Sequence, residues 1–136
     1  MKNLLDPDKA LPGFFSRISL FGNKRGPILF QLPPRWGGNA ERLQKFLPEL
    51  PDGYRYALGL RNPSWLNEKI YQLLRAHGVA FCIDEINFRQ SPNLTTADFV
   101  YLRLHGPGRA YKDPYDLDAL RQWADRIQAW AADGLD

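Results

Sequence analysis

The sequence of 136 residues contains one cysteine, Cys82, so no disulfide framework can form within the chain. Cys82 lies in an apolar run, which predicts a buried free thiol in a reducing compartment. No apolar stretch approaches the roughly 20 residues that a membrane-spanning helix needs. The first residues, Met1 to Asn3, do not lead into a signal-peptide pattern. We therefore expect a cytoplasmic protein that is not inserted in a membrane.

The sequence also lacks internal repeats, low-complexity tracts and linkers, which indicates one domain. None of its predicted strands is followed by a glycine-rich turn of the dinucleotide-binding or phosphate-loop type, so neither of these sites is expected. The sequence also lacks a large excess of charge of one sign. It has 18 Lys and Arg and 15 Asp and Glu, which gives a net charge of +3. This mild excess permits an anionic ligand without requiring nucleic acid as a partner.

Short apolar runs alternate with segments whose apolar residues recur at helical spacing. The predicted strands are 27–32, 54–60, 79–83 and 99–104. The first predicted helix spans 11–21, with Pro12 in its first turn, and the second runs from Asn39 to Leu50. The third begins at Ser64 or Asn67 and ends at Gly78. The last begins at Asp113 or Asp116. Such alternation predicts an α/β fold with a parallel sheet, and both a barrel and an open doubly wound sheet satisfy it.

Two further segments complete this picture. Residues 84–97 show little periodicity. The last helix carries an apolar stripe made of Leu117, Leu120, Trp123, Ile127 and Trp130. Of these, Trp123 and Trp130 are predicted to lie in the core.

Side chains alternate along a strand, so the two faces of each predicted strand can be read separately. One face is large and apolar, and it suits packing under helices. The other face is smaller or more polar and ends in polar residues, namely Gln31, Arg61, Asp84, Arg103 and His105. In a barrel the second face would point to the axis, and these side chains would meet at the C-terminal ends of the strands, where barrels carry active sites.

These residue types suit an anionic substrate. Arg61 and Arg103 would bind phosphate or carboxylate by two-point contacts, with Arg109 and Lys112 on the following loop. His105 would act as a general acid or base, and Asp84 would orient it or serve as the second base.

Structural readings remain open for some of these residues. In this reading Gln31 would form hydrogen bonds with backbone groups of a loop. Arg61 and Asp84 would form an ion pair between neighbouring strands. No tight ligand spacing supports a metal site around Asp84, Glu85 and His105, so we predict none. The residues do not identify a cofactor.

Nucleic-acid binding is a second hypothesis. Tyr101, Tyr111 and Tyr115 lie near basic residues, so bases would stack beside phosphate contacts. The basic residues are dispersed, however, and many adjoin acidic ones, as in Asp125-Arg126. A nucleic-acid partner is therefore not the expectation we favour.

Four segments carry a family resemblance: PILFQLPP at 27–34, RNPSW at 61–65, YLRLHG at 101–106 and the helix with Trp123 and Trp130. Together they resemble the YecE-like family, domain of unknown function 72. The resemblance implies a TIM-type (β/α) barrel of uncharacterised activity whose members are roughly twice as long. The chain would then be a single partial barrel domain over residues 1–136 with about four βα units. The family usually has a glutamate where this chain has Gly59, so a non-catalytic fragment or scaffold is an alternative.

A four-stranded half barrel would leave its axial face and two strand edges open, which is a liability for aggregation. Two copies would close an eight-stranded barrel. We therefore expect self-association or a complementing half-barrel, and poor solubility for an isolated chain.

Overall fold

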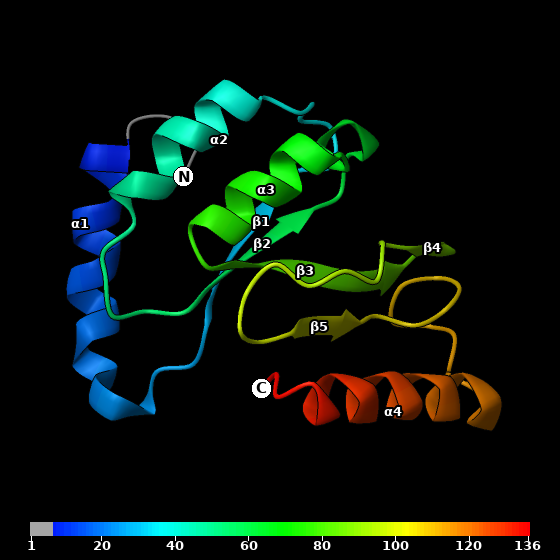
Figure 1. Ribbon diagram of the computed structural model, residues 1–136. Coiled ribbons are helices and arrows are strands. Elements are labelled where there is room, and N and C mark those ends of the chain that lie inside the picture. The colour runs from blue at the N-terminus through cyan, green and yellow to red at the C-terminus, as the bar shows by residue number, and fades with distance from the viewer. Residues whose placement is uncertain (1–6) are drawn as a thin grey trace.

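The structure is a computed structural model that describes residues 7–136 (Figure 1). In chain order its elements are α1 (Pro7–Ile18), the 3₁₀ helix η1 (Ser19–Lys24), β1 (Ile28–Leu32), α2 (Ala40–Phe46), η2 (Leu47–Glu49), β2 (Tyr56–Leu60), η3 (Pro63–Trp65), α3 (Glu68–Ala76), β3 (Val79–Ile86), β4 (Arg89–Gln90), β5 (Tyr101–Leu104) and α4 (Leu117–Ala132). No described helix is both long enough and apolar enough to cross a membrane.

The strands form one sheet in which β1, β2, β3 and β5 are parallel and lie side by side in chain order. The short β4 turns back from the end of β3 and pairs with it antiparallel. The predicted α/β class with a mostly parallel sheet is therefore confirmed. Gln31 lies opposite Gly59 in the register, and Asp84 lies opposite Arg103. The register thus aligns the polar ends of neighbouring strands.

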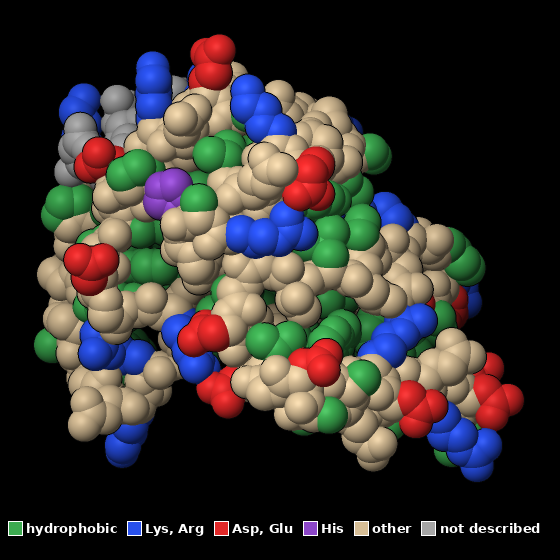
Figure 2. Space-filling view, in the orientation of Figure 1, with side chains coloured by type: hydrophobic (Ala, Val, Ile, Leu, Met, Phe, Trp, Pro, Cys, Tyr) green, Lys and Arg blue, Asp and Glu red, His purple; other side chains and the backbone are tan. Residues whose placement is uncertain are grey.

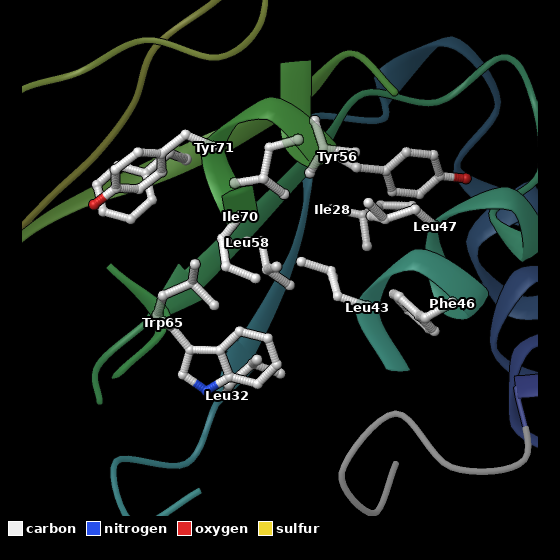
Figure 3. Packing of buried hydrophobic residues seen from close by; sticks show 14 of the residues in the cluster. Ile28, Leu32, Leu43, Phe46, Leu47, Tyr56, Leu58, Trp65, Ile70 and Tyr71 are labelled. Carbon is white, nitrogen blue, oxygen red and sulfur yellow. The ribbon is translucent and has the colours of Figure 1, made fainter. Parts of the chain in front are cut away.

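One face of the sheet is buried under α2 and α3, as Figure 1 shows. Strand residues Leu32 and Leu58 pack there with Leu43 and Trp65 (Figure 3). Phe81 belongs to the same cluster, and each of these five residues is at most 4% exposed. The predicted division of the strands into a large apolar face and a second face is confirmed. Burial of that apolar face is the main driving force that holds the helices on the sheet.

The second face of the sheet is built from small and aromatic side chains at its centre. Ala57, Ala80 and Phe99 are buried there and pack with Leu29 and Tyr101. Because two alanines occupy the middle strands, little side-chain volume covers the sheet backbone at this point. The polar residues follow at the C-terminal ends of the same strands.

Side-chain caps decide where three helices begin. Asn39 accepts a hydrogen bond from the Arg42 amide at the start of α2. Asn67 does the same at α3 and Asp116 at α4, with 3.2 and 2.7 Å between the paired atoms. Each cap satisfies an amide that has no partner within its helix. Of the alternatives that the sequence left open, Asn67 and Asp116 are therefore the caps.

The first helix differs from the prediction. In the described chain α1 spans Pro7–Ile18, so Pro12 lies inside the helix and not in its first turn. The α-helix ends at Ile18, and the chain continues as η1, which bends at Gly22 with a φ of 52°. Glycine adopts this left-handed conformation without steric cost.

The apolar stripe of α4 is buried only in part. Trp123 is 4% exposed, but Leu117, Leu120 and Ile127 are 70%, 45% and 48% exposed. Figure 1 shows α4 beyond β5, at the edge of the sheet. Since β5 has a strand neighbour on one side only among the described residues, part of the stripe has no strand beneath it.

The connection between β3 and β5 contains no α-helix in the described chain. Instead, the aperiodic segment predicted at 84–97 contains the last residues of β3, the strand β4 and a coil. The Thr96 hydroxyl fastens this coil to β3, because it donates to the Val79 carbonyl and accepts from the Phe81 amide. Buried backbone groups at the start of β3 are satisfied in this way.

We predict that Leu58→Ala lowers the free energy of unfolding by about 2–5 kcal/mol, because it leaves a cavity between the sheet and its helices. Chemical denaturation would measure the change. Gln72→Ala, on the exposed side of α3, is the control and should change stability by less than about 0.5 kcal/mol. Equal effects of the two substitutions would contradict the packing described here.

Candidate functional site

Five of the predicted site residues lie at the C-terminal ends of the four parallel strands. With Arg89, which the sequence did not predict, they form a group that we call the rim cluster: Gln31, Arg61, Asp84, Arg89, Arg103 and His105. Parallel strands that lie side by side place their C-terminal ends at one edge of the sheet, and this brings the cluster together.

Asp84 is the acidic centre of the rim cluster and is 3% exposed. Its Oδ2 lies 3.4 Å from Arg61 Nε, and its Oδ1 lies 3.1 Å from Arg89 Nη2. The ion pair between Arg61 and Asp84, which the sequence left open as a structural alternative, is thus present. Two hydrogen bonds to Ser91, one through the Ser91 hydroxyl, fix the Asp84 backbone. A buried carboxylate needs such partners, because an unpaired charge is costly to bury.

Arg89 reaches Asp84 because β4 folds back along β3. The turn between them places Asn87 and Phe88 at φ values of 52° and 58°. Asparagine is enriched in this left-handed region, whereas a phenylalanine there is strained. The pattern Asn-Phe lacks the glycine that usually announces such a turn, so the hairpin gave little signal in the sequence.

Arg103 has a neutral partner. Its Nη1 donates to Gln31 Oε1 at 3.2 Å, and Gln31 Nε2 donates to the Gly59 carbonyl at 2.9 Å. A Cβ atom at Gly59 would lie 2.5 Å from Gln31 Nε2, so the amide occupies the space of the missing side chain. Gly59 therefore allows Gln31 to lie across β2 and hold Arg103.

The rim cluster carries an excess of positive charge. Three guanidinium groups, of Arg61, Arg89 and Arg103, accompany the single carboxylate of Asp84. Among residues 7–136, Arg103 forms no ion pair with an acidic side chain. The cluster is thus short of negative charge, and guanidinium groups match phosphate and carboxylate geometry.

His105 is 7% exposed, and within the described chain its Nε2 is buried without a hydrogen-bond partner. Its ring meets the Tyr111 ring edge to face, with 5.0 Å between the centroids. Burial lowers the pKa of His105 below its ordinary value, and the positive charges of Arg103 and Arg61 lower it further, against the attraction of Asp84. The imidazole is therefore neutral at pH 7 and has a nitrogen available for a ligand.

The side chain of Arg109 is paired with a residue outside the rim cluster. It is 71% exposed at the side chain, and its partner is Asp113, which accepts from both the Arg109 amide and its guanidinium. The same loop is tied to His105, since the Tyr111 amide donates to the His105 carbonyl. Arg109 is thus held on the loop beside the rim.

Cys82 and the tyrosines do not extend the site. Burial, with the charge of Asp84, raises the pKa of the Cys82 thiol to about 12, so it is protonated at neutral pH. Tyr101 packs on the second face of the sheet, and the Tyr115 hydroxyl accepts from the Gly106 amide. Tyr111 is the exposed member of the three tyrosines considered for base stacking, at 76%. Within residues 7–136, no three His, Cys, Asp or Glu residues are grouped to hold a metal ion.

The family comparison settles the resemblance noted in the sequence. A family model described as "Protein of unknown function DUF72" matches residues 1–136. The chain belongs to the DUF72 family. No curated protein matches it.

Two solved DUF72 family proteins share its fold. One from Thermotoga maritima has a TM-score of 0.81 at 25% identity, over 93% of this chain and 55% of that one. One from Enterococcus faecalis has a TM-score of 0.78 at 15% identity, over 94% of this chain and 56% of that one. The chain therefore spans about half the length of the DUF72 proteins that it matches.

We predict that Asp84→Asn lowers the free energy of unfolding by about 1–3 kcal/mol, because it removes the charge that Arg61 and Arg89 face. Urea denaturation would measure the loss. The control is Glu68→Gln, which breaks an exposed ion pair with Arg75 and should cost less than about 1 kcal/mol. A change no larger than that of the control would show that Asp84 does not organise the cluster.

We also predict that Cys82 reacts slowly. With a pKa of about 12, roughly one thiol in ten thousand is ionised at pH 8. Alkylation by iodoacetamide at pH 8, followed by mass spectrometry, should be at least about 100-fold slower in the folded protein than in urea. Similar rates in the two states would contradict the burial of the thiol.

Proposed function

We propose that this chain forms part of a TIM-type (β/α) barrel that binds a small anionic metabolite, bearing phosphate or carboxylate, at the rim cluster. The observation that carries the proposal is the combination of three guanidinium groups, one carboxylate and the His105 Nε2, which is buried without a hydrogen-bond partner among residues 7–136. An anion at this place would supply the missing negative charge and a hydrogen-bond partner.

The order of the strands supports the barrel part of the proposal. β1, β2, β3 and β5 are neighbours in chain order, with no reversal. A doubly wound sheet reverses its strand order at its ligand site, whereas a barrel adds each strand beside the previous one. Residues 1–136 would then be one partial barrel domain, and its C-terminal rim is where barrels carry their active sites.

The five residues of the rim cluster that the sequence predicted each have a role in this proposal. Arg103 and Arg61 bind the anion, and Gln31 orients Arg103. His105 accepts or donates a proton through Nε2 if the bound metabolite is transformed. Asp84 acts as a positioning residue, because its carboxylate is bonded to Arg61 and Arg89.

Arg109 would join the site only after its guanidinium leaves Asp113. We propose the cytoplasm as the compartment, which is reducing and keeps a free thiol such as Cys82 reduced.

The test is sulfate binding by calorimetry at constant ionic strength, because sulfate does not titrate between pH 5 and 8. Arg103→Gln should weaken sulfate binding roughly tenfold or more, since it removes a charged hydrogen-bond donor. Arg75→Gln on α3 is the control and should leave binding unchanged. If Arg103→Gln binds sulfate as the unmodified chain does, the anion site is not at the rim cluster.

The pH dependence of the same binding tests His105. The pKa of His105 lies below its ordinary value of 6.5, so the ring is neutral at pH 7. When the ring takes up a proton at lower pH, it adds positive charge to the rim cluster. The affinity for sulfate should therefore rise as the pH falls from 7 to 5. His105→Gln should abolish this rise, and an unchanged pH profile in that variant would remove His105 from the site.

A second candidate function is that of a non-catalytic scaffold or fragment. It is favoured by the coverage of the solved relatives, of which this chain spans 55% and 56%. In that case sulfate binding at the rim would not be selective over chloride. Nucleic-acid binding has less support, because Tyr101 and Tyr115 are engaged in packing and hydrogen bonding.

A further inference from the structure

The Nε2 atom of His105, which takes part in the proposed anion site, is covered by the protein itself. His105 is 7% exposed, and its Nε2 is buried without a hydrogen-bond partner in the described chain. A buried polar atom without a partner is unusual, because nothing compensates for the loss of its contact with water. A ligand can therefore reach this nitrogen only after a covering group has moved.

Tyr111 is the aromatic residue that lies against the imidazole. The two rings meet edge to face, with 5.0 Å between their centroids and 76° between their planes. The Tyr111 amide also donates to the His105 carbonyl at 2.7 Å, so the backbone of Tyr111 lies beside His105 as well. The rest of Tyr111 faces outward, since this residue is 76% exposed. Tyr111 thus lies between the imidazole and the outside of the described chain.

The backbone that carries this cover is strained. Tyr111 has a φ of 62°, and the other non-glycine residues of the described chain with positive φ are Asn87 and Phe88. All three lie where the β3–β4 turn meets the loop after β5, because the Ala110 amide donates to Asn87 Oδ1 at 3.1 Å. Left-handed backbone is costly for an aromatic residue, and such conformations gather in ligand clamps and switch regions. Movement of Tyr111 out of this conformation would release strain.

Asp113 holds the same loop closed. Its carboxylate accepts hydrogen bonds from the Arg109 amide at 2.6 Å and from the Arg109 guanidinium at 3.1 Å. The loop folds tightly around Asp113, since a Cβ atom at Gly108 would overlap Asp113 Oδ2. Arg109 and Asp113 lie on either side of Tyr111 in the sequence, so their ion pair closes the turn that carries the ring. An anion that competes for the Arg109 guanidinium would weaken this closure.

We propose that Tyr111 is the gate of the anion site: it covers His105 Nε2 in the closed state, and it moves away when an anion draws Arg109 from Asp113. This inference rests on the proposed function, because it describes how access to the same site is regulated. The anion binds the open state better than the closed one, since only the open state offers it both Nε2 and the Arg109 guanidinium. All of these contacts lie within residues 87–113, so none of them depends on further chain at either end.

The first test measures the acylation of His105 by diethyl pyrocarbonate, located by peptide mass spectrometry. The reagent attacks neutral imidazole, and the lowered pKa of His105 keeps its ring neutral at pH 7. The exposed His77 is the internal reference. Because only the open state reacts, His105 should be acylated at least about tenfold more slowly than His77.

Tyr111→Gly should raise the rate of acylation of His105 at least about fivefold, because it removes the covering ring. Glycine adopts the left-handed backbone without strain, so this variant should fold, and circular dichroism would verify that it does. Similar rates for His105 and His77 in the unmodified chain would overturn the proposal.

The matched control is Phe88→Gly. This variant also removes an aromatic ring from a left-handed position, but the ring that contacts the imidazole in the described chain is that of Tyr111. The backbone amide of residue 88, which donates to the Gly108 carbonyl, is retained. His105 should therefore react as it does in the unmodified chain. Equal acceleration by the two glycine substitutions would contradict a specific role of Tyr111.

The second test concerns the ion pair that closes the loop. Asp113→Asn removes the charge that holds the Arg109 guanidinium, and it should raise the rate of acylation of His105 a few-fold, in line with an exposed ion pair. The control is Asp118→Asn, which breaks an exposed pair with Arg121 on α4. Figure 2 shows acidic and basic side chains at the surface over α4, at lower right. Equal rates in these two variants would show that Asp113 does not hold the gate.

Sulfate binding connects the gate to the anion site. Tyr111→Gly should bind sulfate at least about threefold more tightly than the unmodified chain, because less free energy is spent on opening. Phe88→Gly should bind it unchanged. Weaker binding by Tyr111→Gly would overturn the proposal, because the ring would then be part of the binding surface. If no variant binds sulfate while Tyr111→Gly still accelerates acylation, the proposed function is wrong and the cover over His105 stands.

Discussion

The structure depends on the alternation of side chains along four parallel strands held in register. Because each strand turns its large apolar residues to α2, α3 and the other helices, its remaining residues must lie on the second face of the sheet. Burial of the apolar face thereby also fixes the orientation of the residues on the second face, although these residues do not pack under the helices. The rim cluster is a consequence of that constraint, since parallel strands end at the same edge.

The charges at this edge of the sheet are only partly balanced. Asp84 is buried and holds Arg61 and Arg89 by ion pairs, while Arg103 is held by the neutral amide of Gln31. The result is a preorganised set of donors with unbalanced positive charge. Asp84 reduces the repulsion between the guanidinium groups, and an anion would neutralise the positive charge that remains.

Much of the architecture could be predicted from local patterns. The parallel strands, the cap at Asn39 and the two faces of each strand follow from spacing and residue type, which act over a few residues, whereas the choice of Asn67 over Ser64 as a cap came from the structure. The pair Arg61–Asp84 was foreseen because both residues end neighbouring strands. Arg89 could not be foreseen, because it reaches Asp84 only through a hairpin that lacks the usual glycine.

Other features depended on neighbours that are distant in sequence. Gln31 and Arg103 are 72 residues apart, and their contact requires the absence of a side chain at Gly59 on the strand next to Gln31. Arg109 was expected at the site, but an acidic partner on its own loop engages it. The exposed part of the α4 stripe likewise reflects the edge position of β5, which periodicity alone does not reveal.

The sequence by itself determined the fold class, the polarity of each strand face and the residue types at the strand ends, because these follow from short-range periodicity and side-chain chemistry. Only the tertiary structure decided which charges are paired, which nitrogen of His105 is buried without a partner in the described chain, and which strands are neighbours in the sheet. Those properties arise from through-space contacts between segments, and no local pattern in the chain encodes the distance between them.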